Sequence, residues 1–255
     1  TGDKTTALEV VRQFGATKGQ SAAVPDYVIV PTGNGSCLSG MWKGFVELQN
    51  IGAIDRLPKM ISAAIKDASP VYQAFMSEEG QEPEVCDLDQ VPSPELNIGS
   101  VIVAEEGYDS VMATEALRHS GGTAMVVTRD DVQKALIDLL ETEWPTTEKH
   151  GLLPEPASLV ALAAAAKLDG ENIGTPSSSV VAIMTGHGSK AVTLLEELLE
   201  GRPKLLERMQ GPIARAASVQ RSRFPKSREP QRGRMVEVET SKQKLRAILK
   251  KLTAN

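Results

Sequence analysis

Residues 27–40 read YVIVPTGNGSCLSG and join a short apolar run to a glycine-rich turn. The run Tyr27–Val30 is unbroken and is closed by a proline, which is typical of a strand buried on both faces of a sheet. After the turn, Leu38, Met41 and Phe45 follow one another at helical spacing. The stretch therefore predicts a strand that leads through a tight turn into a helix, the opening half of a βαβ unit.

The same alternation of apolar patterns extends along the chain in both directions. Short apolar runs predict the strands Tyr27–Val30, Met60–Ile65, Ala124–Val127 and Val180–Met184. Apolar residues at helical spacing predict the helices Thr5–Phe14, Met41–Leu57, Ser110–Arg118, Asp130–Glu143 (with Asp130 as the N-cap), Glu155–Leu168 and Ala191–Leu199. Strands that alternate with such helices favour an α/β fold, with a partial, doubly wound, mostly parallel sheet and helices on both faces.

Composition divides the chain near residue 200. Residues 1–200 carry the α/β pattern, whereas residues 201–255 form a basic extension with an expected terminal helix, Ser241–Leu252. Between Arg202 and Lys251 there are 15 Lys and Arg against four Asp and Glu, a local charge of +11 that leaves −16 for the rest of a chain whose total is −5. Such a tail either folds back on the acidic body or binds nucleic acid, and both interpretations stay open here.

Composition also argues against several classes of protein. No window approaches the roughly 18 unbroken apolar residues of a membrane span, and the sequence shows no basic-then-apolar pattern of the kind expected for a signal peptide. The two cysteines, Cys37 and Cys86, provide neither a disulfide framework nor metal-ligand spacing, which favours a reducing, cytoplasmic location and no metal. The chain starts at Thr1 and enters a helical pattern within a few residues, so we expect it to be part of something longer.

The turn that follows the first strand suits a phosphate group. Free N–H groups at a helix start attract anions, and glycines let the backbone approach them closely. Two other phosphate loops do not fit, because a Rossmann motif needs glycine at Leu38 and a Walker A loop needs lysine at Met41. A tight turn without any ligand is the alternative. The candidate anion-binding residues are Gly33, Asn34, Gly35, Ser36 and Cys37.

A second polar strand end lies at residues 179–188, which read SVVAIMTGHG. Ligands in open α/β sheets collect at the carboxyl ends of strands, so Thr185 is expected near any site. His187 could act as an acid–base group, although a capping or surface role is the alternative for a histidine between two glycines.

Four places along the chain resemble, in order, the C-terminal half of threonine synthase. That enzyme is a member of the pyridoxal-phosphate family that also includes serine and threonine dehydratases and cysteine synthase, known as fold type II. The similarity extends over about 190 residues, and its order is more specific to the family than to one member. The matching segments are 2–10, 30–58, 116–122 with 153–158, and 183–190.

The resemblance implies pyridoxal 5′-phosphate as the cofactor. Thr185 would hydrogen-bond to its pyridine nitrogen, and a neutral hydroxyl there suits elimination and replacement reactions. Glu155 would support the site from nearby, or would serve only in the N-cap region of a helix. The phosphate of the cofactor would be held by Gly33, Asn34, Gly35, Ser36 and Cys37.

The lysine that forms the Schiff base in this family lies before the segment where this chain starts. Lys4 falls in the helix that re-enters the large domain, and Lys43 and Lys66 are expected on a helix face and in a loop. We therefore expect the chain to lack that lysine, to need a missing N-terminal half as a partner, and to be inactive alone.

The resemblance points to a lyase of threonine biosynthesis, which converts O-phosphohomoserine and water to threonine and phosphate. A cysteate synthase-like or threonine dehydratase-like enzyme is one alternative. A non-catalytic remnant whose basic tail binds nucleic acid or a protein is another. We expect a small amino-acid substrate and no membrane partner, and a homodimer fits the family.

Overall fold

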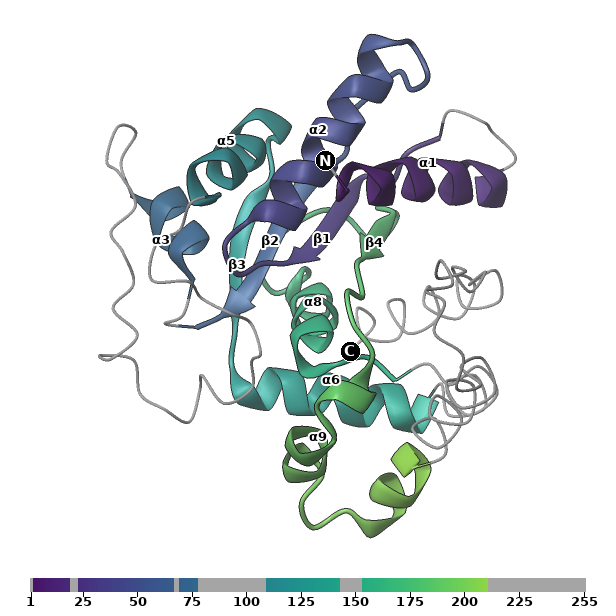
Figure 1. Cartoon of the computed structure of the whole chain (residues 1–255), viewed down its shortest axis with the longest axis vertical. Helices are drawn as coiled ribbons and strands as arrows, with labels where there is room; N and C mark the ends of the chain where they lie inside the picture. Colours follow the sequence, from purple (N-terminus) through teal and green to yellow (C-terminus); the bar gives the residue numbers. More distant parts are fainter. Residues whose placement is uncertain (1, 19–22, 67–68, 78–108, 143–152, 211–255) are drawn as a thin grey trace, which may run out of the picture.

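The computed structural model describes residues 2–18, 23–66, 69–77, 109–142 and 153–210. Its centre is a four-stranded sheet with the order β3-β2-β1-β4, in which every pair of neighbours is parallel (Figure 1). The strands are β1 (Tyr27–Pro31), β2 (Lys59–Ile65), β3 (Thr123–Val127) and β4 (Val180–Ala182). The helices are α1 (Lys4–Lys18), α2 (Ser36–Asn50), α3 (Pro70–Met76), α5 (Ser110–Ser120), α6 (Arg129–Thr142), α8 (Pro156–Lys167), α9 (Val192–Leu198) and the 3₁₀ turn η2 (Gly188–Lys190).

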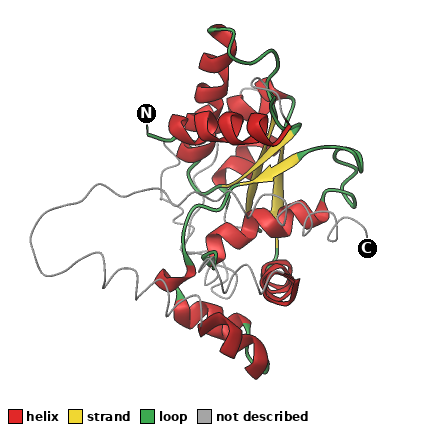
Figure 2. Cartoon of the chain, turned by 90° about the vertical axis from the view of Figure 1, so that its right-hand side faces the viewer, coloured by secondary structure: helices red, strands yellow, loops and turns green. Residues whose placement is uncertain are grey.

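Helices cover both faces of this sheet (Figure 2). Successive residues of a strand point to opposite faces, so each strand feeds two cores. Val28 and Val30 pack with side chains of α1, α2, α3 and α5, whereas Ile29 packs with those of α6, α8 and α9. The expected α/β fold, a doubly wound parallel sheet covered on both faces, is confirmed.

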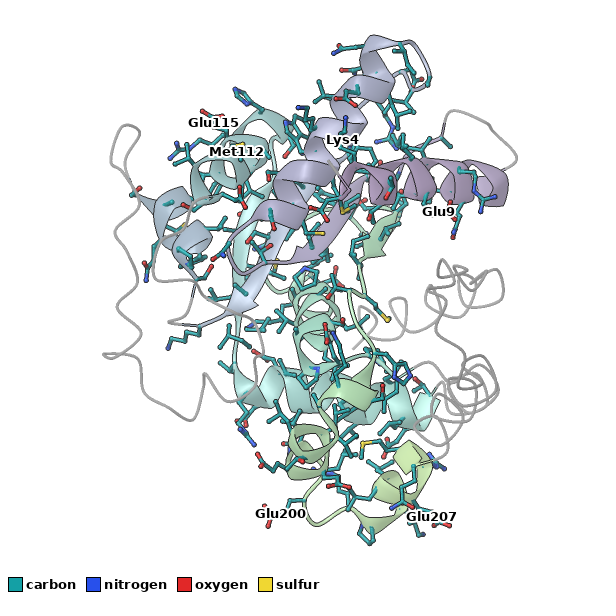
Figure 3. All side chains as sticks on the ribbon, viewed as in Figure 1. Lys4, Glu9, Met112, Glu115, Glu200 and Glu207 are labelled. Carbon is teal, nitrogen blue, oxygen red and sulfur yellow. The ribbon has the colours of Figure 1, made fainter. Side chains whose placement is uncertain are left out.

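The first helix lies unusually close to α2 because two glycines of α2 face it. A Cβ atom on Gly44 would lie 2.9 Å from both the Cβ atom of Ala7 and the carbonyl oxygen of Lys4. A Cβ atom on Gly40 would lie 2.6 Å from the Cβ atom of Asp3. Lys4, which Figure 3 shows where α1 crosses α2, also forms an ion pair with Glu47 at 2.8 Å. These contacts fix the start of α1 against the middle and the last turns of α2.

The helix after the glycine-rich turn is shorter than the sequence predicts. It ends at Asn50 rather than Leu57, because Gly52 adopts the left-handed conformation with φ of 72°. The N–H group of Ala53 then reaches back to the carbonyl oxygen of Leu48 at 2.9 Å, the closing bond of a Schellman motif.

Two other boundaries also correct the sequence predictions. Helix α6 begins at Arg129 and is capped by Thr128, not Asp130: the Thr128 hydroxyl accepts from the Asp131 N–H at 3.3 Å, and the Asp131 carboxylate accepts from the Thr128 N–H at 2.8 Å. Strand β4 ends at Ala182 rather than Met184, although the next N–H group still donates to β1.

The packed region continues beyond residue 201. Residues 203–210 are helical, and the side chains of Leu205 and Met209 are buried in the core that includes α6 and α8. The division between residues 1–200 and 201–255 stays a prediction, and the expected helix Ser241–Leu252 lies outside the described residues. No helix in the described ranges is long and apolar enough to cross a membrane. The same ranges contain no group of three His, Cys, Asp or Glu side chains placed to hold a metal ion.

Candidate functional site

The turn between β1 and α2 presents an uncapped helix start. Gly35 is the N-cap residue, and because it has no side chain it accepts no capping hydrogen bond from the N–H groups of the first turn. Its φ of 97° and the 2.5 Å that would separate an added Cβ atom from the Cβ atom of Ala113 both require glycine. Because the first turn of a helix has no intrahelical acceptors, the N–H groups that follow Gly35 are suited to an anion.

Two polar side chains at this turn, Thr32 and Cys37, bring no negative charge to it. The Thr32 hydroxyl donates to the carbonyl oxygen of Val30 at 2.8 Å, so it is directed back along the strand. Burial and the nearby negative charge of Asp3 raise the pKa of the Cys37 thiol to about 11. The thiol at the helix start is therefore neutral at physiological pH and does not repel an anion.

Thr185 lies at the same edge of the sheet as this turn. Strand β4 pairs with β1, with Ala182 opposite Ile29, and the N–H group of Ile183 donates to the carbonyl oxygen of Ile29 at 2.9 Å. Since the two strands are parallel, their carboxyl ends are neighbours, and the chain continues from one end to Gly33 and from the other to Thr185. The side chain of Thr185 is exposed there.

Ser158, in the first turn of α8, holds the backbone at Thr185. Its buried hydroxyl oxygen accepts hydrogen bonds from the N–H groups of Thr185 at 2.9 Å and Gly186 at 3.1 Å. The same oxygen lies 3.3 Å from the hydroxyl oxygen of Thr185. These contacts fix the direction in which the Thr185 side chain leaves the backbone.

Glu155 occupies the N-cap position of α8, but its side chain makes no capping hydrogen bond. Its carboxylate instead lies 3.4 Å from the hydroxyl oxygen of Thr185 and 2.8 Å from the ammonium group of Lys190. The side chain is only 10% exposed, and Gly186 packs so closely against it that a Cβ atom on Gly186 would collide with the carboxylate. The sequence prediction of a supporting position near Thr185 and the alternative of an N-cap position are thus both compatible with the structure.

His187 and Lys4, two other residues considered from the sequence, make contacts that stabilise the fold. The ring nitrogen Nδ1 of His187 accepts from the N–H group of Ser189 at 3.1 Å and caps η2, which is the capping role left open above. Lys4 pairs with Glu47 on α2, and Lys43 and Lys66 have exposed side chains.

Two participants were not expected from the sequence. Ser158 looks like an ordinary first-turn serine, and Lys190 looks like an ordinary surface lysine after a glycine turn. The one available signal for Ser158 was its place three residues after Glu155, which puts both at the start of the same helix.

The arrangement is that of an α/β protein in which a helix start with Gly35 at its N-cap lies beside a polar strand end. A sequence profile described as "Pyridoxal-phosphate dependent enzyme" matches residues 1–186, and the chain belongs to this family. The cofactor of the family is pyridoxal phosphate.

Curated relatives of the matched region are threonine synthases. The protein of Methanocaldococcus jannaschii is 34% identical over 189 residues, which cover 74% of this chain and 42% of that protein. That of Methanosarcina acetivorans is 32% identical, with coverages of 73% and 41%. The chain thus spans about two fifths of the length of these relatives. A solved structure of a threonine deaminase from T.th. covers 72% of this chain and 56% of its own, with 18% identity and a TM-score of 0.49.

Proposed function

We propose that residues 33–37 hold the phosphate of pyridoxal phosphate and that Thr185 hydrogen-bonds to its ring nitrogen. The observation that carries this proposal is the pairing of β1 with β4, which brings the glycine-capped start of α2 and Thr185 to one edge of the sheet. The fit is supported by the Gly35 N-cap, where only glycine is accommodated, and by the exposed Thr185 hydroxyl.

Each group would have a distinct task. The N–H groups after Gly35 would neutralise and orient the phosphate, which anchors the cofactor. The neutral hydroxyl of Thr185 would donate a hydrogen bond to the ring nitrogen and would keep its proton rather than transfer it to the ring. Pyridoxal phosphate, when bound, supplies a ring that withdraws electrons from the substrate carbon beside the amino group. Glu155 would remain one contact away, as a partner of Thr185.

We propose a threonine synthase-like lyase as the activity of the whole protein. The reaction consumes O-phosphohomoserine and water and yields threonine and phosphate, so the substrate phosphate leaves as inorganic phosphate. The support is the similarity to archaeal threonine synthases at 32–34% identity. Cysteate synthase-like and threonine dehydratase-like reactions are the alternatives within the same family.

The chain would supply only part of that enzyme. In the family pattern the Schiff-base lysine precedes the segment equivalent to residues 2–10, and Lys4 belongs to α1, where it is paired with Glu47. We therefore propose that the isolated chain binds the cofactor without a covalent bond and needs an N-terminal segment for catalysis. The location we propose is the cytoplasm, which is supported by the presence of only two cysteines in 255 residues.

Three measurements on the 255-residue chain test this function. Inorganic phosphate in a crystal soak should lie about 2.7–3.2 Å from the N–H groups of residues 33–37. Pyridoxamine phosphate, which carries the phosphate and the ring, should compete with it. Borohydride reduction in the presence of pyridoxal phosphate should label no single lysine stoichiometrically, whereas a unique labelled lysine would contradict the fragment proposal.

The reaction itself is tested by adding the N-terminal segment. Co-expression of the chain with that segment from the encoding gene, or from a threonine synthase, should release threonine and phosphate in equal amounts from O-phosphohomoserine. Release of a 2-oxo acid from threonine instead would favour the dehydratase alternative.

A further inference from the structure

The Thr185 hydroxyl contacts two polar side chains, those of Ser158 and Glu155. Ser158 Oγ is 3.3 Å away on one side, and Glu155 Oε1 is 3.4 Å away on the other. A hydroxyl group has one hydrogen to donate and two lone pairs to accept with. The positions of the neighbouring hydrogens therefore determine what Thr185 can offer to a ligand.

Ser158 does not accept the hydrogen of the Thr185 hydroxyl. Its own hydrogen can be directed to the Thr185 hydroxyl oxygen at 3.3 Å or to the carbonyl oxygen of Gly186 at 3.4 Å. Both lone pairs of its hydroxyl are occupied by the N–H groups of Thr185 and Gly186, at 2.9 and 3.1 Å. It has no further lone pair for the Thr185 hydrogen. The Thr185 hydrogen is consequently directed either to Glu155 or outward, toward the exposed side.

Glu155 is a strong acceptor for the hydrogen of the Thr185 hydroxyl only when the negative charge of its carboxylate is not neutralised by a nearby cation. A buried carboxylate needs a counter-charge or strong hydrogen bonds, and Lys190 supplies the charge at 2.8 Å. Lys190 pairs with Oε2 of this carboxylate, whereas the Thr185 hydroxyl donates to the other oxygen, Oε1, over a long distance of 3.4 Å. Gly186, which packs closely against the carboxylate, limits movement of Glu155 away from this position.

We propose that Lys190 is a positioning residue for Thr185. By pairing with Glu155, it leaves the hydroxyl proton of Thr185 available for donation into the cofactor site. The identity of the acceptor, the ring nitrogen, rests on the proposed function, whereas the competition between Lys190 and Thr185 for Glu155 does not. Without Lys190, the Thr185 hydroxyl donates its hydrogen bond to Glu155. Its oxygen then faces the ring with a lone pair, which favours the protonated form of the ring nitrogen.

The first experiment needs no ligand. The 255-residue chain is labelled with ¹³C-threonine, and exchange of the Thr185 hydroxyl hydrogen is followed by the hydrogen–deuterium isotope effect on its Cβ signal. Lys190→Met should slow this exchange about tenfold or more, since hydrogen bonds to charged groups exceed neutral ones. Lys190→Arg should restore the fast exchange, and Lys204→Met, which removes another exposed lysine, should leave it unchanged.

Unchanged exchange in Lys190→Met, or equal slowing in Lys204→Met, would overturn the inference. In a Glu155→Gln background the Lys190 substitution should lose its effect, because no charge is left to compensate. A persistent effect in that background would mean that Lys190 acts by another route, and would likewise overturn it.

The second experiment reports on the ring. Pyridoxamine phosphate labelled with ¹⁵N in the ring is bound to the chain, and Lys190→Met should move the nitrogen signal toward that of the protonated ring. In a Thr185→Val background this shift should vanish. If the unmodified chain and Lys190→Met both bound the ligand with identical nitrogen signals, the inference would be contradicted. If the unmodified chain did not bind pyridoxamine phosphate, the proposed function would be contradicted. The exchange experiment would then decide about Lys190.

Discussion

The Asp26 carboxylate before β1 accepts two hydrogen bonds from Ser179 before β4, at 2.7 Å from the N–H group and 2.6 Å from the hydroxyl. Arg56 forms an ion pair with the same carboxylate at 3.1 Å. Burial alone would raise the pKa of Asp26, but the bonds from Ser179 and the charge of Arg56 outweigh it and lower the pKa. The contact joins the starts of two neighbouring strands that lie far apart along the chain.

Asp26→Asn should therefore lower the free energy of unfolding by about 1 kcal/mol at neutral pH, a modest value because the carboxylate is partly exposed. A carboxylate with a lowered pKa stabilises the fold above its unfolded pKa of about 3.9, and this contribution disappears as the pH falls through the folded pKa. Urea denaturation at several pH values should show the two proteins converging in acid. The exposed Asp169→Asn is the control, and an effect that persisted in acid would exclude the ionised contact as its cause.

Gly35→Ala should destabilise the chain more than Gly52→Ala. Both glycines have positive φ, of 97° and 72°, so both substitutions introduce backbone strain of about 1 kcal/mol. Only at Gly35 does the new methyl group also collide with Ala113, since no atom lies within 4 Å of the position at Gly52. We expect a loss of about 2–4 kcal/mol at Gly35, measured by urea denaturation, together with weaker phosphate binding. Equal losses of unfolding free energy in the two variants would show that the turn at Gly35 shifts to accommodate the methyl group, which would contradict this prediction.

Thr185→Ser and Thr185→Val separate the hydroxyl from the shape of the side chain. Serine retains the hydroxyl and should bind pyridoxamine phosphate nearly as well as threonine. Valine leaves the ring nitrogen without a partner, which costs about 1–3 kcal/mol and lowers the affinity about tenfold or more. Isothermal titration of both variants measures the difference. If the two held the ligand equally well, Thr185 would be an ordinary strand-end residue.

Cys37 should react slowly with iodoacetamide in the folded chain. With a pKa of about 11, roughly one thiol in a thousand is ionised at pH 8. The rate should keep rising with pH up to about 11, and Asp3→Asn should speed the reaction by removing a negative charge beside the thiol. Mass spectrometry of the Cys37 peptide distinguishes it from Cys86. A rate that reaches its plateau near pH 8.5 would contradict the raised pKa.

The sheet and most of its helices could be predicted because each is encoded locally, but α3 and the helical residues 203–210 were not predicted. Residues 159–165 are buried on every side of α8, and their run of Leu, Val and Ala predicts such a helix without any tertiary information. The ends of individual helices were harder to predict, because each depends on a single local interaction. Gly52 ends α2 before Leu57, and Thr128 rather than Asp130 caps α6. A short apolar pattern does not indicate which of two nearby polar residues, here Thr128 or Asp130, caps the helix.

The site was only partly predictable for a different physical reason. Gly35 and Thr185 follow predicted strands, so their positions at one edge could be inferred from topology. The contacts of Ser158 and Lys190 depend on the return of residues 185–190 to the start of α8, where the Gly188 N–H group donates to the carbonyl oxygen of Leu153. No local pattern in the sequence encodes that approach.

The pairing of β4 with β1 has a consequence for how the protein folds. It joins Tyr27 to Val180, so the loop that must close between them comprises about 150 residues. Closing so long a loop is entropically unfavourable until the intervening elements have already packed, and topologies of this kind form slowly. On the ribosome the segment with Thr185 emerges long after the helix start at Gly35. Residues 33–37, for which we propose phosphate binding, are therefore synthesised well before Thr185. A truncation that removes β4 leaves this proposed phosphate site without the residue proposed to meet the ring.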